Sequence, residues 1–207
     1  MTNRLLLVSL SILLSLIFVG CQPTLKFIYG VDKDKYFDSL EDYKSFVERK
    51  TKLDTDKFYL VENDNLFNLM EEFSGKSFGY YYGTINKGKL VADGLNSGID
   101  TSCYGSVLNA LKSNDMHTES PKDCRIVNYA YITFSKQGVN LDFEEDTAVF
   151  LFTYKRGRFN NDILKLIEEV RSQNKDYIIL SVDNHYIKDQ NQNPMLKNQM
   201  LLPASGE

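Results

Sequence analysis

The side chains best suited to chemistry follow two apolar segments in the second half of the chain. The first segment, residues 148–154, leads into a basic loop that contains Lys155, Arg156 and Arg158. If the segment is a strand and a helix follows, this loop lies at a strand's carboxyl end and at a helix N-terminus, two places that favour anions. The three cations therefore form a candidate binding site for a phosphate, a carboxylate or an acidic partner. The alternative is a charged turn in contact with solvent.

Asp183 and His185 follow the second apolar segment, residues 177–182. Parallel neighbouring strands would bring both side chains to the same sheet edge as the basic loop. There Asp183 could orient His185 for acid–base chemistry or share a metal ion with it. The alternative is an ordinary strand end. We expect no metal centre and no cofactor, because the chain has only two histidines, no glycine-rich nucleotide loop and no Gly-x-Ser-x-Gly motif.

Two of the three cysteines, Cys103 and Cys124, are candidates for a disulfide. An even pair in an oxidising compartment tends to form a bridge, which here would close a loop of about 20 residues and stabilise the fold by roughly 3 kcal/mol. The segment inside that loop, 113–122, is polar and rich in turn formers. The two residues are not spaced as a redox Cys-x-x-Cys pair. The alternative is two buried free thiols.

The third cysteine, Cys21, ends the most distinctive segment of the chain. Arg4 precedes an apolar run from Leu5 to Gly20, which at about 1.5 Å per residue is short for a bilayer core of about 30 Å. A basic start, a short apolar region and small residues at the exit are typical of a secretory signal peptide. Its last five residues read Ile-Phe-Val-Gly-Cys. The alternative is an uncleaved anchor helix with an incidental cysteine.

This last stretch resembles the lipobox of bacterial lipoproteins, in which a small residue precedes an invariant cysteine. Phe18 departs from the pattern, because leucine is usual at that position. The resemblance implies that Cys21 carries a diacylglyceryl group, that the chain is cleaved before it, and that the new amine can be acylated. Two or three acyl chains attach a protein stably to a membrane. Gln22 in place of an aspartate implies the outer membrane, and the lack of an acidic cluster after Cys21 implies its periplasmic face.

The composition indicates a folded domain that does not bind nucleic acid. The chain contains 13 tyrosines and 13 phenylalanines, more than a largely disordered chain would have. Its formal net charge is −4, and loss of residues 1–20, whose only charged residue is Arg4, makes it more negative. A mildly acidic chain without a long basic run is poorly suited to nucleic acid. The expected partners are the membrane and a protein or a small ligand.

Apolar periodicity predicts an alternation of strands and helices. The expected strands are 25–29, 58–61, 78–85, 89–92, 125–134, 148–154 and 177–182. Expected helix starts are Ser39, one of 63–65, the vicinity of Ser102, and 160 or 161. The core face of the second helix is expected to be Leu66, Leu69, Met70 and Phe73. Residues 86–88 turn a hairpin whose aromatic first strand either stacks on a ligand or packs in the core.

These elements predict the α/β or α+β class, with a mixed β-sheet and flanking helices. Residues 148–182 resemble the βαβ start of a thioredoxin-like domain, and residues 57–112 resemble its βαββα end, in swapped order. The resemblance implies a rearranged thioredoxin-like arrangement. It does not imply disulfide chemistry, because residues 155–158 stand where that family has Cys-x-x-Cys, and the proline expected before the hairpin is missing.

We therefore expect four parts: a cleaved signal peptide (1–20), a lipidated tether (21–24), one α/β globular domain (25–188) and a polar C-terminal tail (189–207). The expected function is that of a membrane-anchored envelope lipoprotein whose domain is a non-catalytic binding or structural module. The alternative is an envelope enzyme, or a redox-inactive thioredoxin-like protein, that uses the edge formed by the basic loop with Asp183 and His185.

Overall fold

The computed structural model describes residues 34–188 apart from 77, 137 and 142. The predicted signal peptide, the tether with Cys21, the strand 25–29 and the tail 189–207 lie outside the described residues. The α-helices are α2 (Leu40–Lys50), α3 (Asn63–Glu72), α4 (Tyr104–Ser113) and α5 (Asn161–Ser172). The strands are β1 (Phe58–Val61), β2 (Tyr81–Asn86), β3 (Lys89–Asp93), β4 (His117–Asp123), β5 (Tyr131–Ile132), β6 (Thr147–Phe152) and β7 (Asp176–Ser181). The 3₁₀ helices are η1 (Thr55–Lys57), η2 (Arg125–Asn128), η3 (Tyr154–Asn160) and η4 (Asp183–Tyr186).

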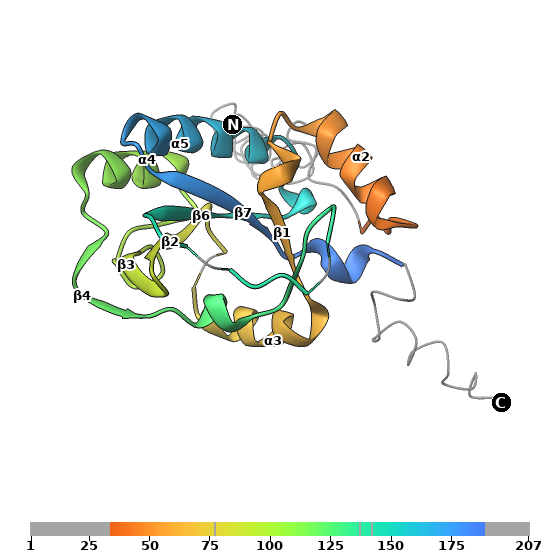
Figure 1. The fold of residues 1–207 in the computed structure, drawn as a ribbon. Helices are drawn as coiled ribbons and strands as arrows, with labels where there is room; N and C mark the ends of the chain where they lie inside the picture. The colour runs from red at the N-terminus through yellow and green to blue at the C-terminus, as the bar shows by residue number, and fades with distance from the viewer. Residues whose placement is uncertain (1–33, 77, 137, 142, 189–207) are drawn as a thin grey trace, which may run out of the picture.

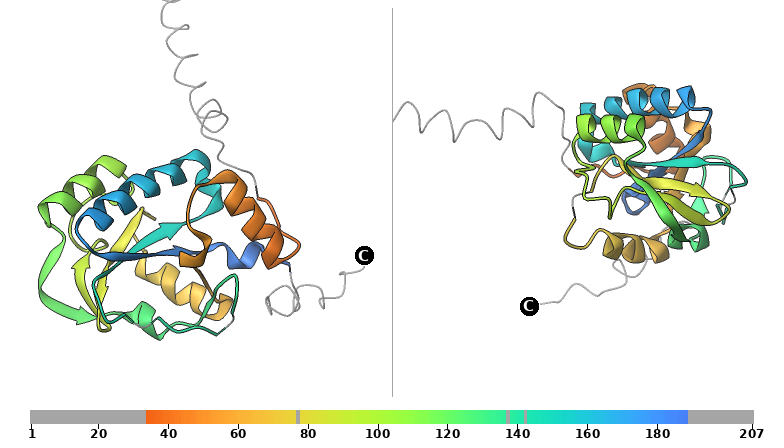
Figure 2. Two further views of the ribbon diagram at one scale, coloured as in Figure 1. Left: turned by 45° about the horizontal axis from the view of Figure 1, so that its top comes forward. Right: turned by 90° about the vertical axis from the view of Figure 1, so that its left-hand side faces the viewer.

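The strands form one mixed sheet in the order β4-β3-β2-β6-β7-β1-β5. Helices α2, α4 and α5 cover one face of this sheet, and α3 lies on the other face (Figure 1). The right-hand view of Figure 2 shows these layers edge-on, with the sheet between α4 and α5 on one side and α3 on the other. Each face has its own cluster of buried side chains. The expected class, a mixed sheet with flanking helices, is confirmed.

The centre of the sheet is the predicted βαβ unit, β6-α5-β7. The two strands pair in parallel along their whole length, from Thr147 with Asp176 to Phe152 with Ser181. Their near-continuous apolar sequences follow from burial on both faces. The inward side chains of α5 are the four predicted ones, Ile163, Leu166, Ile167 and Val170. Burying each of them favours folding by about 1.5 to 3 kcal/mol.

Helix α2 begins where the capping pattern predicted. The N–H group of Asp42 donates to Oγ of Ser39 at 3.1 Å, which satisfies one of the first free amides of the helix. Tyr43 and Phe46 on its inner face are buried, and the ring of Phe46 lies 6.1 Å from that of Tyr154. Packing of α2 thus brings its C-terminal turn to the carboxyl end of β6. Thr51 ends the helix with extended backbone.

Two predicted segments near the sheet edges are wrong. Residues 125–134 are not a long strand: the chain forms η2 first, and β5 contributes only Tyr131 and Ile132, which pair with β1. The polar segment expected to be a loop contains the edge strand β4, whose backbone pairs with β3. Apolar pattern marks strands that are buried on a face. It therefore misses β4, which is almost entirely exposed, and it mistakes the buried 3₁₀ turn around Ile126 for a strand.

Helix α3 differs from its prediction in its N-cap and in one residue of its buried face. Its first residue is Asn63, and the preceding Glu62 makes no side-chain cap, so none of the predicted capping residues caps it. Leu69 and Phe73 are buried as predicted, whereas Met70 is 47% exposed. The buried face of α3 is therefore narrower than the apolar pattern of its sequence predicts.

The two segments compared with thioredoxin-type halves lie in one sheet. Strand β2 of the 57–112 segment pairs antiparallel with β6, and β1 of the same segment pairs in parallel with β7. The predicted hairpin β2–β3 is present. The resemblance to the family itself stays a prediction.

Candidate anion-binding cavity

The basic loop is η3, which connects β6 to the N-terminus of α5 as predicted. Oγ1 of Thr153, just before the loop, accepts a hydrogen bond from the N–H of Lys155 at 3.4 Å. Gly157 has φ 54° and ψ −127°, a conformation that residues with a Cβ avoid. The backbone reverses at this glycine. Arg156 before it and Arg158 after it therefore have different surroundings.

The guanidinium of Arg156 is engaged by the protein itself. Its guanidinium donates to the carbonyl oxygen of Leu151 at 3.1 Å, and also to those of Phe78 and Gly79. The same group lies over the rings of Phe78 and Tyr80, 4.7 and 5.0 Å from their centroids. Burial lowers the pKa of Arg156 to about 10, so it stays charged at neutral pH. These contacts tie the loop to the segment before β2 and leave the guanidinium little capacity for a ligand.

The charge of Lys155 is balanced by a carboxylate of the protein. Its Nζ forms an ion pair with Asp34 at 2.5 Å and lies 4.7 Å from the centroid of the Tyr186 ring. Hydrogen bonds to Asp34 and Tyr186 raise the pKa of Lys155. The ammonium therefore already has a counter-ion.

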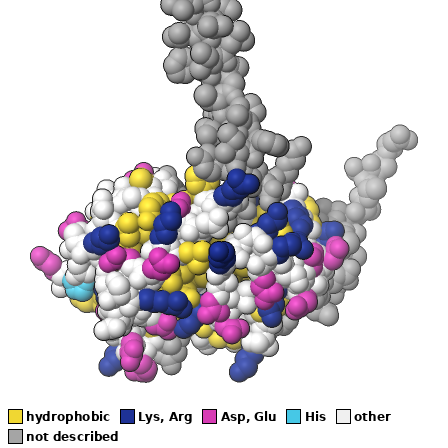
Figure 3. All heavy atoms as spheres, turned by 90° about the horizontal axis from the view of Figure 1, so that it is seen from above, with side chains coloured by type: hydrophobic (Ala, Val, Ile, Leu, Met, Phe, Trp, Pro, Cys, Tyr) yellow, Lys and Arg dark blue, Asp and Glu magenta, His cyan; other side chains and the backbone are white. Residues whose placement is uncertain are grey.

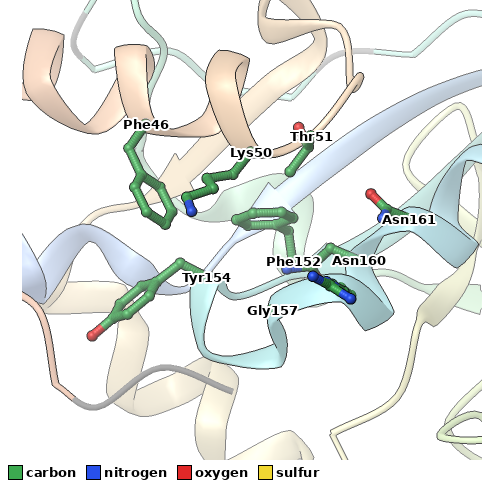
Figure 4. A pocket seen from close by; sticks show the side chains of 9 residues that line it. Phe46, Lys50, Thr51, Phe152, Tyr154, Gly157, Asn160 and Asn161 are labelled. Atoms are coloured by element: carbon green, nitrogen blue, oxygen red, sulfur yellow. The ribbon is translucent and has the colours of Figure 1, made fainter. Parts of the chain in front are cut away.

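Arg158 lines a cavity that neither Lys155 nor Arg156 lines. The cavity has a volume of about 310 Å³ and lies between α2, the end of β6 and the start of α5. Figure 4 shows Phe46, Lys50 and Thr51 reaching into it from α2, opposite Phe152 and Tyr154. The space-filling view of this face shows Lys and Arg side chains gathered toward the end where α2 lies (Figure 3).

The cavity brings two cations together without a protein counter-ion. Lys50 and Arg158 are both exposed, and within the described ranges neither forms an ion pair with a carboxylate. A third cation is nearby, since Nζ of Lys35 lies 4.5 Å from the centroid of the Phe46 ring. The same space borders the N-terminus of α5, whose dipole adds positive potential. The electrostatic character of the cavity is therefore that of an anion site.

Asn160 forms a second unusual feature of this cavity. Its side chain is 2% exposed, and Nδ2 donates to the carbonyl oxygen of Thr153 at 2.9 Å. Oδ1 is buried and has no hydrogen-bond partner among the described residues. A buried acceptor without a donor costs about 1 to 3 kcal/mol. Although Asn160 lines the cavity, this oxygen is enclosed by the protein and is not accessible to a molecule bound there.

Asp183 lies at the carboxyl end of β7, as predicted, but its side chain is buried in the protein interior. Its carboxylate accepts hydrogen bonds from Tyr43 Oη at 2.8 Å, Thr153 Oγ1 at 2.7 Å and the N–H of Tyr154 at 2.7 Å. The side chain is fully buried. Burial raises the pKa of Asp183 to about 6, and the three hydrogen bonds oppose that shift. Through these hydrogen bonds the carboxylate connects the end of β7 to α2 and to the start of η3.

His185 lies two residues after Asp183 in the chain. Its Nδ1 is 3.0 Å from the carbonyl oxygen of Val182, and its ring centroid is 3.8 Å from that of Tyr186. Burial lowers the pKa of His185, which favours the neutral ring. Neither His185 nor Asp183 lines the cavity. The structure therefore divides the predicted edge: Arg158 faces the cavity, while Asp183, Arg156 and Lys155 are engaged in internal contacts.

The lining of the cavity contains no histidine, cysteine, serine or carboxylate. Of the groups that can act as nucleophile or general base, the lining has Lys50, Thr51 and Tyr154. In the described part of the chain, no group of three or more metal-binding side chains is arranged to hold an ion.

The predicted bridge between Cys103 and Cys124 is not formed in the structure. Both thiols are free, Cys103 exposed and Cys124 buried. Cys103 directly precedes α4 on one face of the sheet, whereas Cys124 belongs to the buried cluster on the other face, with its Sγ 4.0 Å from Tyr82 Oη. A disulfide needs Cα atoms within about 7 Å. The sheet between the two faces keeps these thiols apart.

The aromatic strand is part of the core. Tyr80, Tyr81 and Tyr82 are each no more than 5% exposed. The hydroxyl of Tyr81 hydrogen-bonds with Thr84, and that of Tyr82 donates to Glu72 at 2.7 Å. Of the two interpretations of this strand, core packing is the one that the structure bears out.

Sequence reasoning missed most of the cavity. Lys50 and Phe46 belong to a helix more than 100 residues before the loop, and no spacing rule links the end of α2 to the end of β6. Asn160 was considered only as a helix cap, a role in which its side chain makes no hydrogen bond. A cation at the end of an amphipathic helix is the one sequence feature that pointed to Lys50, and it is common in proteins.

Comparison with known proteins found no relative. No protein-family model matches the chain, and neither the curated proteins nor the solved structures gave a match. Over residues 34–188, with 77, 137 and 142 left aside, no helix has both the length and the apolar character needed to cross a membrane.

Proposed function

We propose that this chain is a lipid-anchored envelope protein that binds a small anionic ligand without transforming it. One observation carries the proposal: Lys50 and Arg158 converge on a cavity, and neither has a carboxylate partner in the described part of the chain. Cations held beside a helix N-terminus form a favourable place for a carboxylate or a phosphate. The lining has no histidine, cysteine, serine or carboxylate beside these cations, which favours binding over catalysis.

The proposal is tested by removing the two cations together. We expect the Lys50→Ala, Arg158→Ala double variant to bind anions at least about tenfold more weakly than the unchanged protein, because hydrogen bonds to charged groups contribute about 1.5 to 3 kcal/mol each. Acetate, inorganic phosphate and phenylacetate serve as probes, titrated into the full-length protein by calorimetry at low salt.

The matched control is the Arg49→Ala, Lys52→Ala double variant. These two exposed residues flank the end of α2, carry the same total charge and do not line the cavity. They should leave binding within about twofold, since exposed charges at a distance are screened. Equal weakening in both double variants, or no binding of any probe, would remove the proposal.

The anchor is tested separately, by intact mass of the protein from its native envelope. The lipobox resemblance predicts a chain that begins at Cys21 and carries the mass of two or three acyl groups. An unmodified chain that retains Met1 would contradict the lipid anchor and leave the cavity proposal untouched.

A further inference from the structure

We infer that the anion bound by this cavity is the headgroup of an anionic phospholipid in the membrane that carries the chain's own lipid anchor. The inference rests on the proposed function, on its cavity and on its anchor alike, and it names the ligand. Three features of the same face lead to it: the place where the described chain begins, the accessible cations of the cavity, and an exposed tyrosine beside them.

The described chain begins at the rim of the cavity. The N–H group of Lys35 donates to Oη of Tyr154 at 2.8 Å, and its Nζ lies 4.5 Å from the centroid of the Phe46 ring. Both Tyr154 and Phe46 line the cavity. Twelve residues separate Cys21 from Asp34, and their fully extended length is at most about 45 Å. An anchor at Cys21 therefore holds the domain close to the bilayer by the end that carries the cavity.

The carboxylates at this entry are already paired with lysines. Asp34 forms its ion pair with Lys155 at 2.5 Å, and Asp38 forms one with Lys188 at 3.1 Å. Each pair balances its own charge. An anionic bilayer that approaches this face therefore meets little uncompensated negative charge where the domain begins.

The cations of the cavity are accessible to a headgroup. Helix α2 has acidic residues in its first turn and basic residues in its last, so its basic end borders the cavity. Lys50 in that turn and Arg158 in η3 are both exposed, and neither pairs with a carboxylate of the described ranges. A phosphodiester of net negative charge suits this pair, whereas a zwitterionic headgroup brings an ammonium that the pair repels. The charges favour an anionic phospholipid.

The anchor favours a phospholipid over an anion free in solution. Each basic side chain near an anionic bilayer strengthens binding about fivefold, so two contribute about 30-fold. A dilute free anion would leave so weak a site mostly empty. A tether, in contrast, presents the headgroups at an effective concentration on the order of millimolar or higher. A weak site on an anchored domain is therefore filled by the membrane itself.

Tyr36 extends the surface next to the cavity. Its side chain is 50% exposed, and its ring lies 5.7 Å from that of Tyr186. The Tyr186 ring in turn lies 5.1 Å from that of Tyr154 in the cavity lining. Tyrosine is favoured at bilayer interfaces because its ring is apolar and its hydroxyl is polar. Tyr36 thus adds an interfacial contact that a soluble anion would not use.

A fluorescence experiment tests docking on the lipid-anchored, full-length protein. The chain has no tryptophan, so Tyr36→Trp introduces a single fluorophore on the proposed surface. The protein is reconstituted into vesicles of phosphatidylcholine, alone or mixed with phosphatidylglycerol, that contain lipids with brominated acyl chains as quenchers. We expect quenching to be at least about twofold stronger with phosphatidylglycerol, because the two cations hold the domain on an anionic surface. Lys50→Ala with Arg158→Ala should remove this difference.

The matched control is the Lys122→Ala, Arg125→Ala double variant in the same background. These two exposed cations lie in β4 and η2, carry the same total charge and do not line the cavity. Their removal should leave the difference in quenching unchanged. Circular dichroism confirms that each variant is folded.

A titration tests whether the headgroup alone is recognised. Glycerophosphoglycerol and glycerophosphocholine are the headgroups of the two lipids without their acyl chains. We expect the first to bind the full-length protein at least about fivefold more tightly, since the second adds a positive charge near the two cations. Equal affinities would contradict the preference for an anionic headgroup.

The outcomes separate the inference from the proposed function. Equal quenching in both kinds of vesicle, or equal loss in the two double variants, would overturn the inference. Binding of inorganic phosphate in solution without docking on phosphatidylglycerol vesicles would also overturn it, and would leave a site for a free anion. A chain that retains Met1 without acyl groups would overturn the inference and leave the cavity standing. Failure of every soluble probe would remove both proposals.

Discussion

The two halves of η3 have the same kind of sequence and opposite roles. Arg156, before the reversal at Gly157, is held by three backbone carbonyls and two aromatic rings. Arg158, after it, is exposed and lines the cavity with Lys50. Both are arginines in one charged motif, and the motif alone gives no reason to separate them.

The comparison teaches that the capacity to bind depends on which donors are left over. The donors of Arg156 are used within the fold, and the charge of Lys155 is balanced by Asp34. Arg158 has no such contact among the described side chains, so its charge is available. A substitution at the first arginine should therefore act on stability, and a substitution at the second should act on binding.

The largest expected effect comes from Arg156→Ala. We expect it to lower the free energy of unfolding by about 3 to 5 kcal/mol, because it leaves three carbonyl groups without their donor and removes packing against Phe78 and Tyr80. Urea unfolding followed by circular dichroism measures the change.

Arg158→Ala is the matched control within the same loop. It should change the free energy of unfolding by no more than about 0.5 kcal/mol, as is usual for an exposed residue. Similar losses in the two variants would show that the loop acts as one unit and that the distinction between its halves is false.

A smaller effect is expected from the buried carboxylate of Asp183, and it depends on pH. Burial raises its pKa to about 6 in the folded protein, above the value of about 3.9 in an unfolded chain. The folded state then binds the proton more tightly than the unfolded state does. The stabilisation from this group is therefore complete below about pH 4 and is lost as the pH rises through 6.

Asp183→Asn removes that titration. Relative to the variant, the unchanged protein should lose about 2 kcal/mol of unfolding free energy between pH 4 and pH 7, which is most of the effect of a shift of about two pKa units. Urea unfolding of both proteins at several pH values measures the difference. A difference that stays constant with pH would mean that the three hydrogen bonds to Asp183 outweigh the effect of its burial.

The smallest of the three effects is expected at Gly157, where the two halves meet. Gly157→Ala should lower the free energy of unfolding by about 1 to 2 kcal/mol, because φ 54° with ψ −127° is strained for alanine. It should also weaken anion binding, since the turn places Arg158. Urea unfolding and the phenylacetate titration measure the two effects.

Gly105→Ala supplies a control of opposite sign. Gly105 lies in α4, and a Cβ there would meet no atom within 4 Å. Alanine at this position should raise stability by up to about 1 kcal/mol through its helix propensity. Destabilisation by both substitutions would indicate that added bulk, and not the backbone conformation of Gly157, is responsible.

Much of the fold could be predicted from the sequence because its strongest signals are local. The Ser39 cap, the apolar stripe of α5 and the buried strands β6 and β7 follow from spacing and burial within a few residues. The errors lie at the edges of the sheet. There a polar strand such as β4 depends only on backbone pairing, which the sequence pattern does not display.

The candidate site was predicted in part. Arg158 was placed correctly beside a strand end and a helix N-terminus, because both features are local. Lys50 and Phe46 were missed, since they come from a helix far away in the chain. The pairing of Cys103 with Cys124 was predicted from number and compartment, and those considerations do not reveal that a sheet separates the two residues.

By itself, the sequence determined the class of the fold, the order of its central elements and the concentration of positive charge after β6. It also predicts the lipid anchor at Cys21, which lies outside the described residues. Only the tertiary structure decided which cations remain available for a ligand. The physical reason is that a side chain's donors are used or left free by partners that the fold brings from elsewhere, as the carbonyls before β2 do for Arg156 and as none of the described carboxylates does for Arg158.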